Sequence, residues 1–184
     1  YKKNIFIQGK GKVEIGNKKE EIEYNLNFID DKLIYDAVLF LNKVSIKFDL
    51  LNFLKKENVK SKIRIKGKNN KNLFNIQKVS LETNDSEISA DNFEIKNNFK
   101  ISNFDKIKLN YIDSHKKKND LIISKKKEEY IITGKEFDIS MIIDEILKSE
   151  NEDSLKLFDK KNRIFKVNFD KNYIDKDHFL VKLK

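Results

Sequence analysis

Strict alternation of apolar and polar residues is the feature that most constrains this chain. Between Glu21 and Phe28 every even position is apolar and every odd position is polar. A segment of this kind forms a β-strand with one covered face and one solvated face. The same period recurs over residues 44–48 and 59–66, and short alternating segments separated by Asn, Asp and Ser fill residues 73–112. This spacing is typical of an antiparallel meander, so we predict a mainly β fold.

The period changes from two to that of a helix after Gly134. The apolar residues that follow fall on one face of an α-helix: Ile139, Ile142, Ile143, Ile146 and Leu147. Asp138 is placed to cap the first turn, and Phe137 is placed to staple against Ile142. We therefore predict a short helix over residues 138–148, with Phe137 and Asp138 in structural roles.

An earlier segment repeats this pattern. Phe48 and Asp49 precede another apolar run, so Asp49 is predicted to cap a helix that ends near Lys56, with Phe48 stapled to Phe53. Two matches of seven residues can also arise by chance in a chain rich in Phe, Asp and Ile. The predicted fold is a curved antiparallel sheet, open like a groove, with two short α-helices.

The predicted helices are too few to cover all of the strands. The sheet therefore either closes on itself as a sandwich or barrel, or stays open with an apolar face that a ligand or partner covers. Alternation alone does not separate these two arrangements. Residues 1–184 suit a single domain, with no shift in composition that marks a boundary. Because the chain begins with Tyr1 and not Met, we expect it to be a segment of a longer protein.

The charge of the chain points to two classes of partner. The formal net charge is +9, which suits a nucleic acid or an anionic membrane surface. Lysine is spread evenly, however, and arginine occurs only at Arg64 and Arg163. Arginine is the residue expected at bidentate phosphate and guanine contacts, so nucleic-acid binding is not predicted. Lysine clusters at 116–118 and 125–127 suit solvated loops, or a contact with anionic head groups.

No catalytic or metal-binding pattern occurs in the sequence. The chain has no cysteine, and its two histidines, His115 and His178, have no companion at metal or acid–base spacing. Gly-x-Ser-x-Gly, P-loop and Gly-x-Gly-x-x-Gly motifs are also lacking. We therefore predict neither an enzyme nor a cofactor or metal site, and expect both histidines to be solvated.

Three consecutive segments carry a family resemblance. Residues 101–110, the predicted hairpin 121–133 and residues 134–140 with the following aliphatic helix resemble the AsmA-like superfamily. The chain is most similar to YhdP/TamB-type periplasmic β-groove proteins of Gram-negative bacteria, in the domain of unknown function beside the AsmA-like C-terminal region. The resemblance covers about residues 60–170 and is a pattern of strand, Gly, Phe-Asp and helix. It is not a catalytic signature.

This resemblance implies a location and a function. Such proteins are anchored in the inner membrane by an N-terminal helix, which this chain lacks, and extend across the periplasm as a β-sheet with an apolar groove. They handle phospholipids that move to the outer membrane and serve outer-membrane biogenesis. The implied partners are lipid acyl chains, the membrane surface and neighbouring β-groove segments of the same chain. The high Lys and Asn content departs from the family's pattern.

The alternating strands supply the candidate groove residues. The first set comprises Ile22, Tyr24, Leu26 and Phe28, and the second comprises Val44, Ile46 and Phe48. These residues fit a closed core equally well. Lys62 and Lys66 suit either a polar rim for head groups or plain solvent exposure. The alternative functions are a structural β-domain that binds a protein through a sheet edge and a basic nucleic-acid binder.

Overall fold

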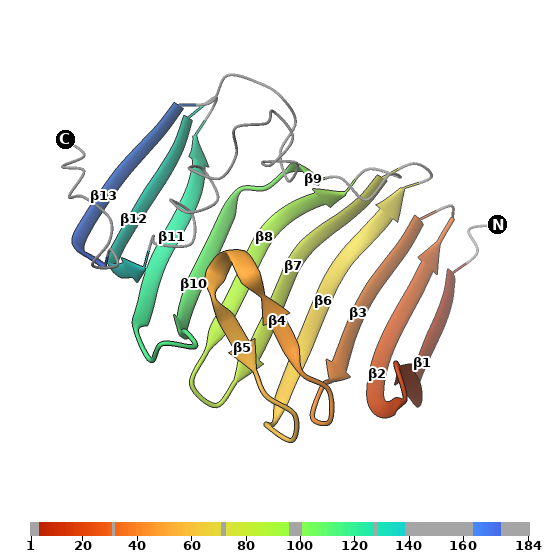
Figure 1. Ribbon diagram of the computed structural model, residues 1–184. Helices are drawn as coiled ribbons and strands as arrows, with labels where there is room; N and C mark the ends of the chain where they lie inside the picture. Colours follow the sequence, from red (N-terminus) through yellow and green to blue (C-terminus); the bar gives the residue numbers. More distant parts are fainter. Residues whose placement is uncertain are drawn as a thin grey trace, which may run out of the picture.

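One large β-sheet dominates the computed structural model, which describes residues 4–30, 32–70, 73–95, 101–126, 129–138 and 164–173 (Figure 1). Eleven strands form the sheet, in the order β1-β2-β3-β6-β7-β8-β10-β11-β12-β13, with β9 paired to β8. Their bounds are β1 (Asn4–Ile15), β2 (Lys18–Ile29), β3 (Lys32–Phe40), β6 (Ser61–Asn70), β7 (Leu73–Thr83), β8 (Glu87–Ile95), β9 (Ile101–Asn103), β10 (Lys106–Ile112), β11 (Lys118–Lys126), β12 (Glu129–Asp138) and β13 (Ile164–Tyr173).

The sheet is open and almost wholly antiparallel. Only the β12–β13 pair is parallel among the strands described. Within the same residues β1 pairs with β2 alone and β13 with β12 alone, so the sheet does not close into a barrel. These observations confirm the predicted mainly β, open antiparallel sheet.

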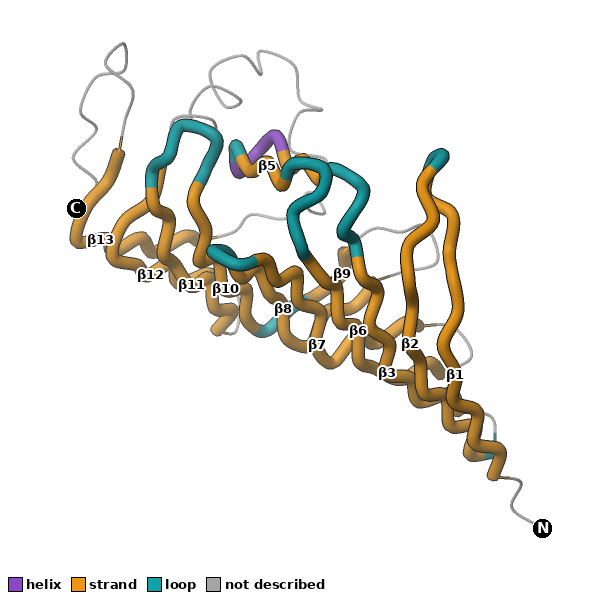
Figure 2. The backbone as a smooth tube through the Cα atoms, turned by 90° about the horizontal axis from the view of Figure 1, so that it is seen from below, coloured by secondary structure: helices purple, strands orange, loops and turns teal. Residues whose placement is uncertain are grey.

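The connection between β3 and β6, which pair directly in the large sheet, contains a second, two-stranded sheet. Strands β4 (Ile46–Phe48) and β5 (Phe53–Lys55) form a hairpin within the connection from β3 to β6. Figures 1 and 2 show this hairpin standing over one face of the large sheet. The chain therefore leaves the sheet after β3, crosses that face and returns to pair with β3 again.

Cross-strand register places apolar residues on one face of the sheet, which we call the apolar face. Residues directly opposite one another share a face, and one continuous row crosses eight strands: Tyr24, Ala37, Ile65, Val79, Ala90, Ile107, Ile123 and Ile132. The adjacent row on the same face is also apolar: Ile22, Leu39, Ile63, Leu81, Ile88, Leu109 and Leu121. The apolar residues of the alternating strands thus form one continuous surface.

The opposite face of the sheet is polar. One of its rows consists of Asn25, Asp36, Lys66, Lys78, Asp91, Lys106 and Ser124. Ion pairs join neighbouring strands here, including Lys62–Glu82 at 2.9 Å and Lys108–Glu87 at 2.9 Å. Lys62 and Lys66 therefore lie on the polar face, away from the rim of the apolar one.

The hairpin closes a core against part of the apolar face. The buried cluster comprises Phe53, Leu81, Leu109, Tyr111, Leu121 and Phe137. Phe53 of β5 is 3% exposed and meets Tyr111 edge-to-face, with ring centroids 5.7 Å apart. Ile46 and Leu51 of the hairpin also pack on this cluster. The hairpin therefore covers this part of the apolar face, which the predicted helices were expected to cover.

The first predicted helix, Asp49 to about Lys56, is wrong. A single 3-10 turn spans Asp49–Leu51, and the chain then enters β5. Phe48 and Phe53 are cross-strand partners whose stacked rings lie 5.8 Å apart, where a helical staple was expected. Asp49 makes no capping hydrogen bond and instead pairs with Lys47 at 2.5 Å. The aromatic pair across a tight turn stabilises a hairpin in preference to a helix.

The end of the strand that the change of period after Gly134 predicts is also wrong. Strand β12 continues through Gly134 to Asp138, because Gly134 and Lys135 accommodate a β-bulge opposite the Asp120–Leu121 step of β11. Phe137 is a core residue, 5% exposed, and Asp138 is the last residue of the strand. Residues 139–148, which hold the predicted helix itself, lie outside the described residues. The part of the chain that the structure describes contains no α-helix.

Candidate functional site

The first set of candidate groove residues shares one surface. Ile22, Tyr24, Leu26 and Phe28 alternate along β2 and all point to the apolar face, where each is half-buried. The hairpin packs on the cluster carried by β7, β10, β11 and β12. No described element lies over the apolar side of β1 to β3 (Figure 1). This part of the apolar face is therefore covered by neither strand nor helix among the described residues.

The second set of candidates lies on the hairpin and its approach. Val44 precedes β4, Ile46 packs against the core cluster, and Phe48 is 40% exposed beside Phe53. The structure therefore does not bring Val44, Ile46 and Phe48 onto the sheet surface that holds Ile22 and Tyr24.

On the open part of the apolar face, two tyrosine side chains each lie over a glycine of the neighbouring strand. A Cβ at Gly9 would come 2.7 Å from the Tyr24 hydroxyl, and a Cβ at Gly67 would come 2.6 Å from that of Tyr35. The Tyr35 hydroxyl donates to the Asn75 carbonyl at 3.4 Å, and burial raises the pKa of Tyr35. The glycines let each phenol ring lie flat on the neighbouring strand, which keeps this surface smooth.

Strand β1 presents large apolar side chains at the edge of the sheet. Ile5, Phe6 and Ile7 are 52%, 61% and 43% exposed. Ile5 and Ile7 continue the apolar face beside Phe28 and Leu26, whereas Phe6 points to the other side. Among the described strands β1 pairs with β2 alone, so the backbone groups of its outer edge face no other described strand.

The base of the hairpin is fixed to the sheet by buried polar groups. Glu20 of β2 is 2% exposed and accepts from the backbone N–H groups of Lys43 and Val44 at 2.5 and 3.0 Å. Lys55 of β5 is 3% exposed and donates to the carbonyls of Leu41 and Val44. Desolvation lowers the pKa of Lys55, while the nearby Glu20 carboxylate opposes that shift. The hairpin is therefore attached on the side facing β2.

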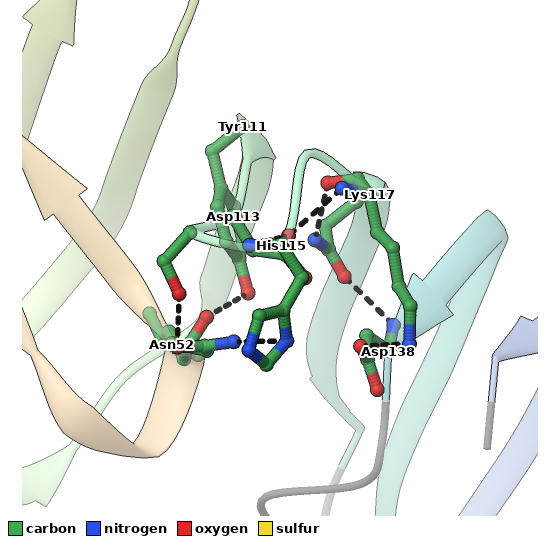
Figure 3. Close-up of polar contacts among 9 residues, drawn as sticks. Asn52, Tyr111, Asp113, His115, Lys117 and Asp138 are labelled. Atoms are coloured by element: carbon green, nitrogen blue, oxygen red, sulfur yellow. Dashed lines mark hydrogen bonds and ion pairs between the residues drawn. The ribbon is translucent and has the colours of Figure 1, made fainter. Parts of the chain in front are cut away.

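The tip of the hairpin is fixed to the turn between β10 and β11 (Figure 3). The Ser114 hydroxyl donates to Asn52 Oδ1 at 2.5 Å, and Asn52 Nδ2 lies 2.9 Å from His115 Nδ1. The Tyr111 hydroxyl donates to the Leu51 carbonyl at 2.9 Å. Desolvation, with Asp113 and Asp138 nearby, raises the pKa of Tyr111. The hairpin thus contacts the sheet at both of its ends.

Three possible metal ligands meet beside this tip. Asp113, His115 and Asp138 each place a ligand atom within 4.8 Å of those of the other two. His115 and Asp138 are 23 residues apart in the sequence, a spacing that forms no recognised motif. Their proximity follows from the β10–β11 turn lying beside the end of β12 (Figure 3). His115 is exposed as expected, and His178 lies outside the described residues.

The β7–β8 turn carries a separate polar hollow of 390 Å³, lined by residues 82–87 and Asn110. Its lining is rich in carboxylates and amides, which makes it a poor site for an acyl chain. The apolar face is therefore the stronger candidate for an apolar ligand.

Comparison of the chain with protein-family models, with curated proteins and with solved structures finds no match. The resemblance to the AsmA-like superfamily accordingly stays a prediction. No helix in the described part of the chain is long and apolar enough to cross a membrane.

Proposed function

We propose that this chain forms one segment of a curved periplasmic groove that holds phospholipid acyl chains on their way between the inner and outer membranes. The observation that supports this function best is the part of the apolar face over β1 to β3 that no described element covers, where Ile22, Tyr24, Leu26 and Phe28 are half-buried. The anchor in the inner membrane and the periplasmic location are carried over from the AsmA-like resemblance. Enzymatic activity is not part of this proposal.

The dimensions of the apolar face suit a lipid. A β-strand rises about 3.3 Å per residue, so the six steps from Ile22 to Phe28 on the uncovered part of the apolar face span about 20 Å. The acyl region of one leaflet is about 15 Å thick, half of the bilayer's hydrocarbon core. The uncovered surface along β2 is therefore long enough for one acyl chain. Ile22, Tyr24, Leu26 and Phe28 would bind the chain where the hairpin leaves the face uncovered.

Neighbouring segments of the same chain can extend this surface through the sheet edge. Ile5 and Ile7 of β1 carry the apolar face to the last described strand on that side. A further strand paired with β1 would continue the apolar face and cover the exposed edge.

The first test replaces one side chain on each face of β2. Leu26→Asp places a charge on the open part of the apolar face, and Asn25→Asp places the same charge on the polar face one residue away. Each variant is expressed in a lipid-rich bacterial host and examined by native mass spectrometry. The proposal expects wild type and Asn25→Asp to carry phospholipid and Leu26→Asp to be lipid-free yet folded.

A third variant calibrates this test against a closed core. Leu121 is 1% exposed beneath the hairpin, so Leu121→Asp is expected to unfold, because an unpaired buried charge costs several kcal/mol. If Leu26→Asp unfolds in the same way, or if wild type carries no lipid, the groove function is wrong for this chain.

A second candidate function is binding of a protein partner through the β1 edge. The exposure of Ile5, Phe6 and Ile7 favours it, because unpaired strand edges recruit further strands. Phe6→Lys would abolish such binding and leave lipid binding intact, since Phe6 points away from the apolar face. Nucleic-acid binding is disfavoured, because lysines on the polar face such as Lys62 and Lys108 pair with glutamates.

A further inference from the structure

A mixed set of metal ligands lies between the β10–β11 turn and the end of β12. Asp113 and His115 come from the turn, Asp138 ends the strand, and their ligand atoms lie within 4.8 Å of one another. We propose that these three residues bind one divalent transition-metal cation, with Zn²⁺ as the representative ion. The site does not depend on lipid binding.

A buried carboxylate oxygen without a partner points to this ligand. Asp113 is 5% exposed, and its Oδ1 accepts from the backbone N–H groups of His115 and Lys117 at 2.9 and 2.8 Å. Its Oδ2 is buried and has no hydrogen-bond partner. Leaving such an atom unpaired costs free energy. A bound cation would supply the missing partner while the two backbone bonds hold the carboxylate in place.

The second carboxylate is held by the same local framework. Asn119 is fully buried, and its Oδ1 accepts from the Asp138 N–H at 2.7 Å while its Nδ2 donates to the Lys117 carbonyl at 3.2 Å. The Asp138 side chain is only 7% exposed. Asn119 therefore ties the end of β12 to the turn, which fixes Asp138 relative to Asp113 (Figure 3).

The third ligand, His115, has a hydrogen-bond partner for one of its two ring nitrogens. His115 Nδ1 lies 2.9 Å from the Asn52 side-chain amide. If the amide is rotated by 180°, its oxygen accepts from a protonated Nδ1 and its Nδ2 donates to the Ser114 hydroxyl, which leaves His115 Nε2 as the ligand atom. Metal-bound histidines usually make such a bond to a carbonyl or carboxylate. A cation here would also hold the hairpin tip, because Asn52 belongs to the hairpin.

The ligand types select the class of ion. An imidazole with two carboxylates suits Zn²⁺ and related transition metals, whereas Ca²⁺ and Mg²⁺ prefer oxygen ligands throughout. Lys117 competes with the cation, because its Nζ lies 2.7 Å from Asp138 Oδ2. The Lys117 side chain is 29% exposed and can turn toward solvent. Lys117→Met is therefore expected to bind Zn²⁺ more tightly than wild type.

Isothermal titration of the chelator-treated chain with Zn²⁺, and separately with Mg²⁺, tests the proposal. We expect one equivalent of Zn²⁺ and no Mg²⁺ at the same concentrations. Asp113→Asn, which keeps the Oδ1 acceptor, and His115→Ala should each weaken Zn²⁺ binding at least tenfold. His178→Ala removes the chain's other histidine and should leave the affinity unchanged.

Stability provides a second readout. Zn²⁺ should raise the melting temperature of wild type and of His178→Ala, but not of His115→Ala. Because His115 is exposed, His115→Ala is expected to fold even if Asp113→Asn does not. The proposal is overturned if wild type binds no Zn²⁺, if Asp113→Asn and His115→Ala bind it as tightly as wild type does, or if His178→Ala is the variant that loses it.

Discussion

Glu20 and Lys55 bind the same residue, Val44, through its two backbone groups. Glu20 Oε1 accepts from the Val44 N–H at 3.0 Å, and Lys55 Nζ donates to the Val44 carbonyl at 2.6 Å. Both side chains are almost fully buried, at 2% and 3% exposure. Opposite charges on the two sides of one peptide segment satisfy its polar groups where water is excluded. The hairpin therefore leaves the sheet through a segment in which these two residues hold both backbone groups of Val44.

Replacement of Glu20 should destabilise the protein strongly. Glu20→Ala leaves the Lys43 and Val44 N–H groups without their acceptor and the Lys55 ammonium without its nearby carboxylate. We expect a loss of about 2–6 kcal/mol in the free energy of unfolding, because each buried N–H group left without an acceptor costs about 1–3 kcal/mol. Urea denaturation followed by circular dichroism measures this loss.

The adjacent glutamate provides the control. Glu21 is exposed and points to the polar face, so Glu21→Ala should change the free energy of unfolding by no more than about 0.5 kcal/mol. Equal effects of the two substitutions would show that the Glu20 carboxylate does not hold the hairpin.

Two glycines on the apolar face should respond oppositely to a methyl group. At Gly67 an added Cβ overlaps the backbone carbonyl oxygen of Asn75 and lies 2.6 Å from the Tyr35 hydroxyl. Because the backbone cannot swing aside, we expect Gly67→Ala to cost about 1–3 kcal/mol. At Gly11 the nearest atom is Ile22 Cγ2 at 3.7 Å, so Gly11→Ala should be neutral or stabilising by up to about 1 kcal/mol. Thermal melts of both variants check the difference, and an unchanged Gly67→Ala would contradict the close packing of β6 on β7.

The strands could be predicted from sequence because their signal is local. Alternation over residues 21–28 and 59–66 reports directly on a sheet with two unlike faces. The helix expected from Asp49 failed for a reason that lies outside the segment. Phe53 has Tyr111 as a packing partner, 58 residues away, and this contact favours an aromatic hairpin over a capped helix. Likewise the change of period after Gly134 predicts the end of the strand there, although a bulge against β11 lets the strand continue past it.

The cluster beside the hairpin tip could not be predicted at all. Asp113, His115 and Asp138 match no motif, and only the antiparallel pairing of β11 with β12 places Asp138 beside the preceding turn. The role of Asn119 in fixing Asp138 could not be predicted either, because its neighbours Lys118 and Asp120 indicate a solvated turn. These residues come together only when β10, β11 and β12 pair in one particular register, and the patterns in a single sequence do not specify that register.

Tyr111 should make the protein sensitive to alkaline pH. Its hydroxyl donates to the Leu51 carbonyl at 2.9 Å, and its side chain is 1% exposed. Desolvation raises the pKa of Tyr111 above the ordinary value of 10.0, with Asp113 and Asp138 adding to the shift. Above pH 10 the unfolded chain therefore releases this proton while the folded protein keeps it. The stability that is fully present below pH 10 is then lost as the pH rises, by up to about 1.4 kcal/mol per pH unit.

The variant Tyr111→Phe isolates the contribution of the Tyr111 phenol to the pH dependence of stability, because the other groups that titrate at alkaline pH are present in both proteins. At pH 8 the variant should be about 1 kcal/mol less stable than wild type, since the Leu51 carbonyl loses its donor. Between pH 10 and pH 11 the wild type should lose stability more steeply than the variant, so the two curves converge. Urea denaturation at half-unit steps of pH measures both slopes. Parallel curves across this range would mean that the phenol of Tyr111 ionises as readily in the folded protein as in the unfolded chain, and that the hairpin does not seal it from water.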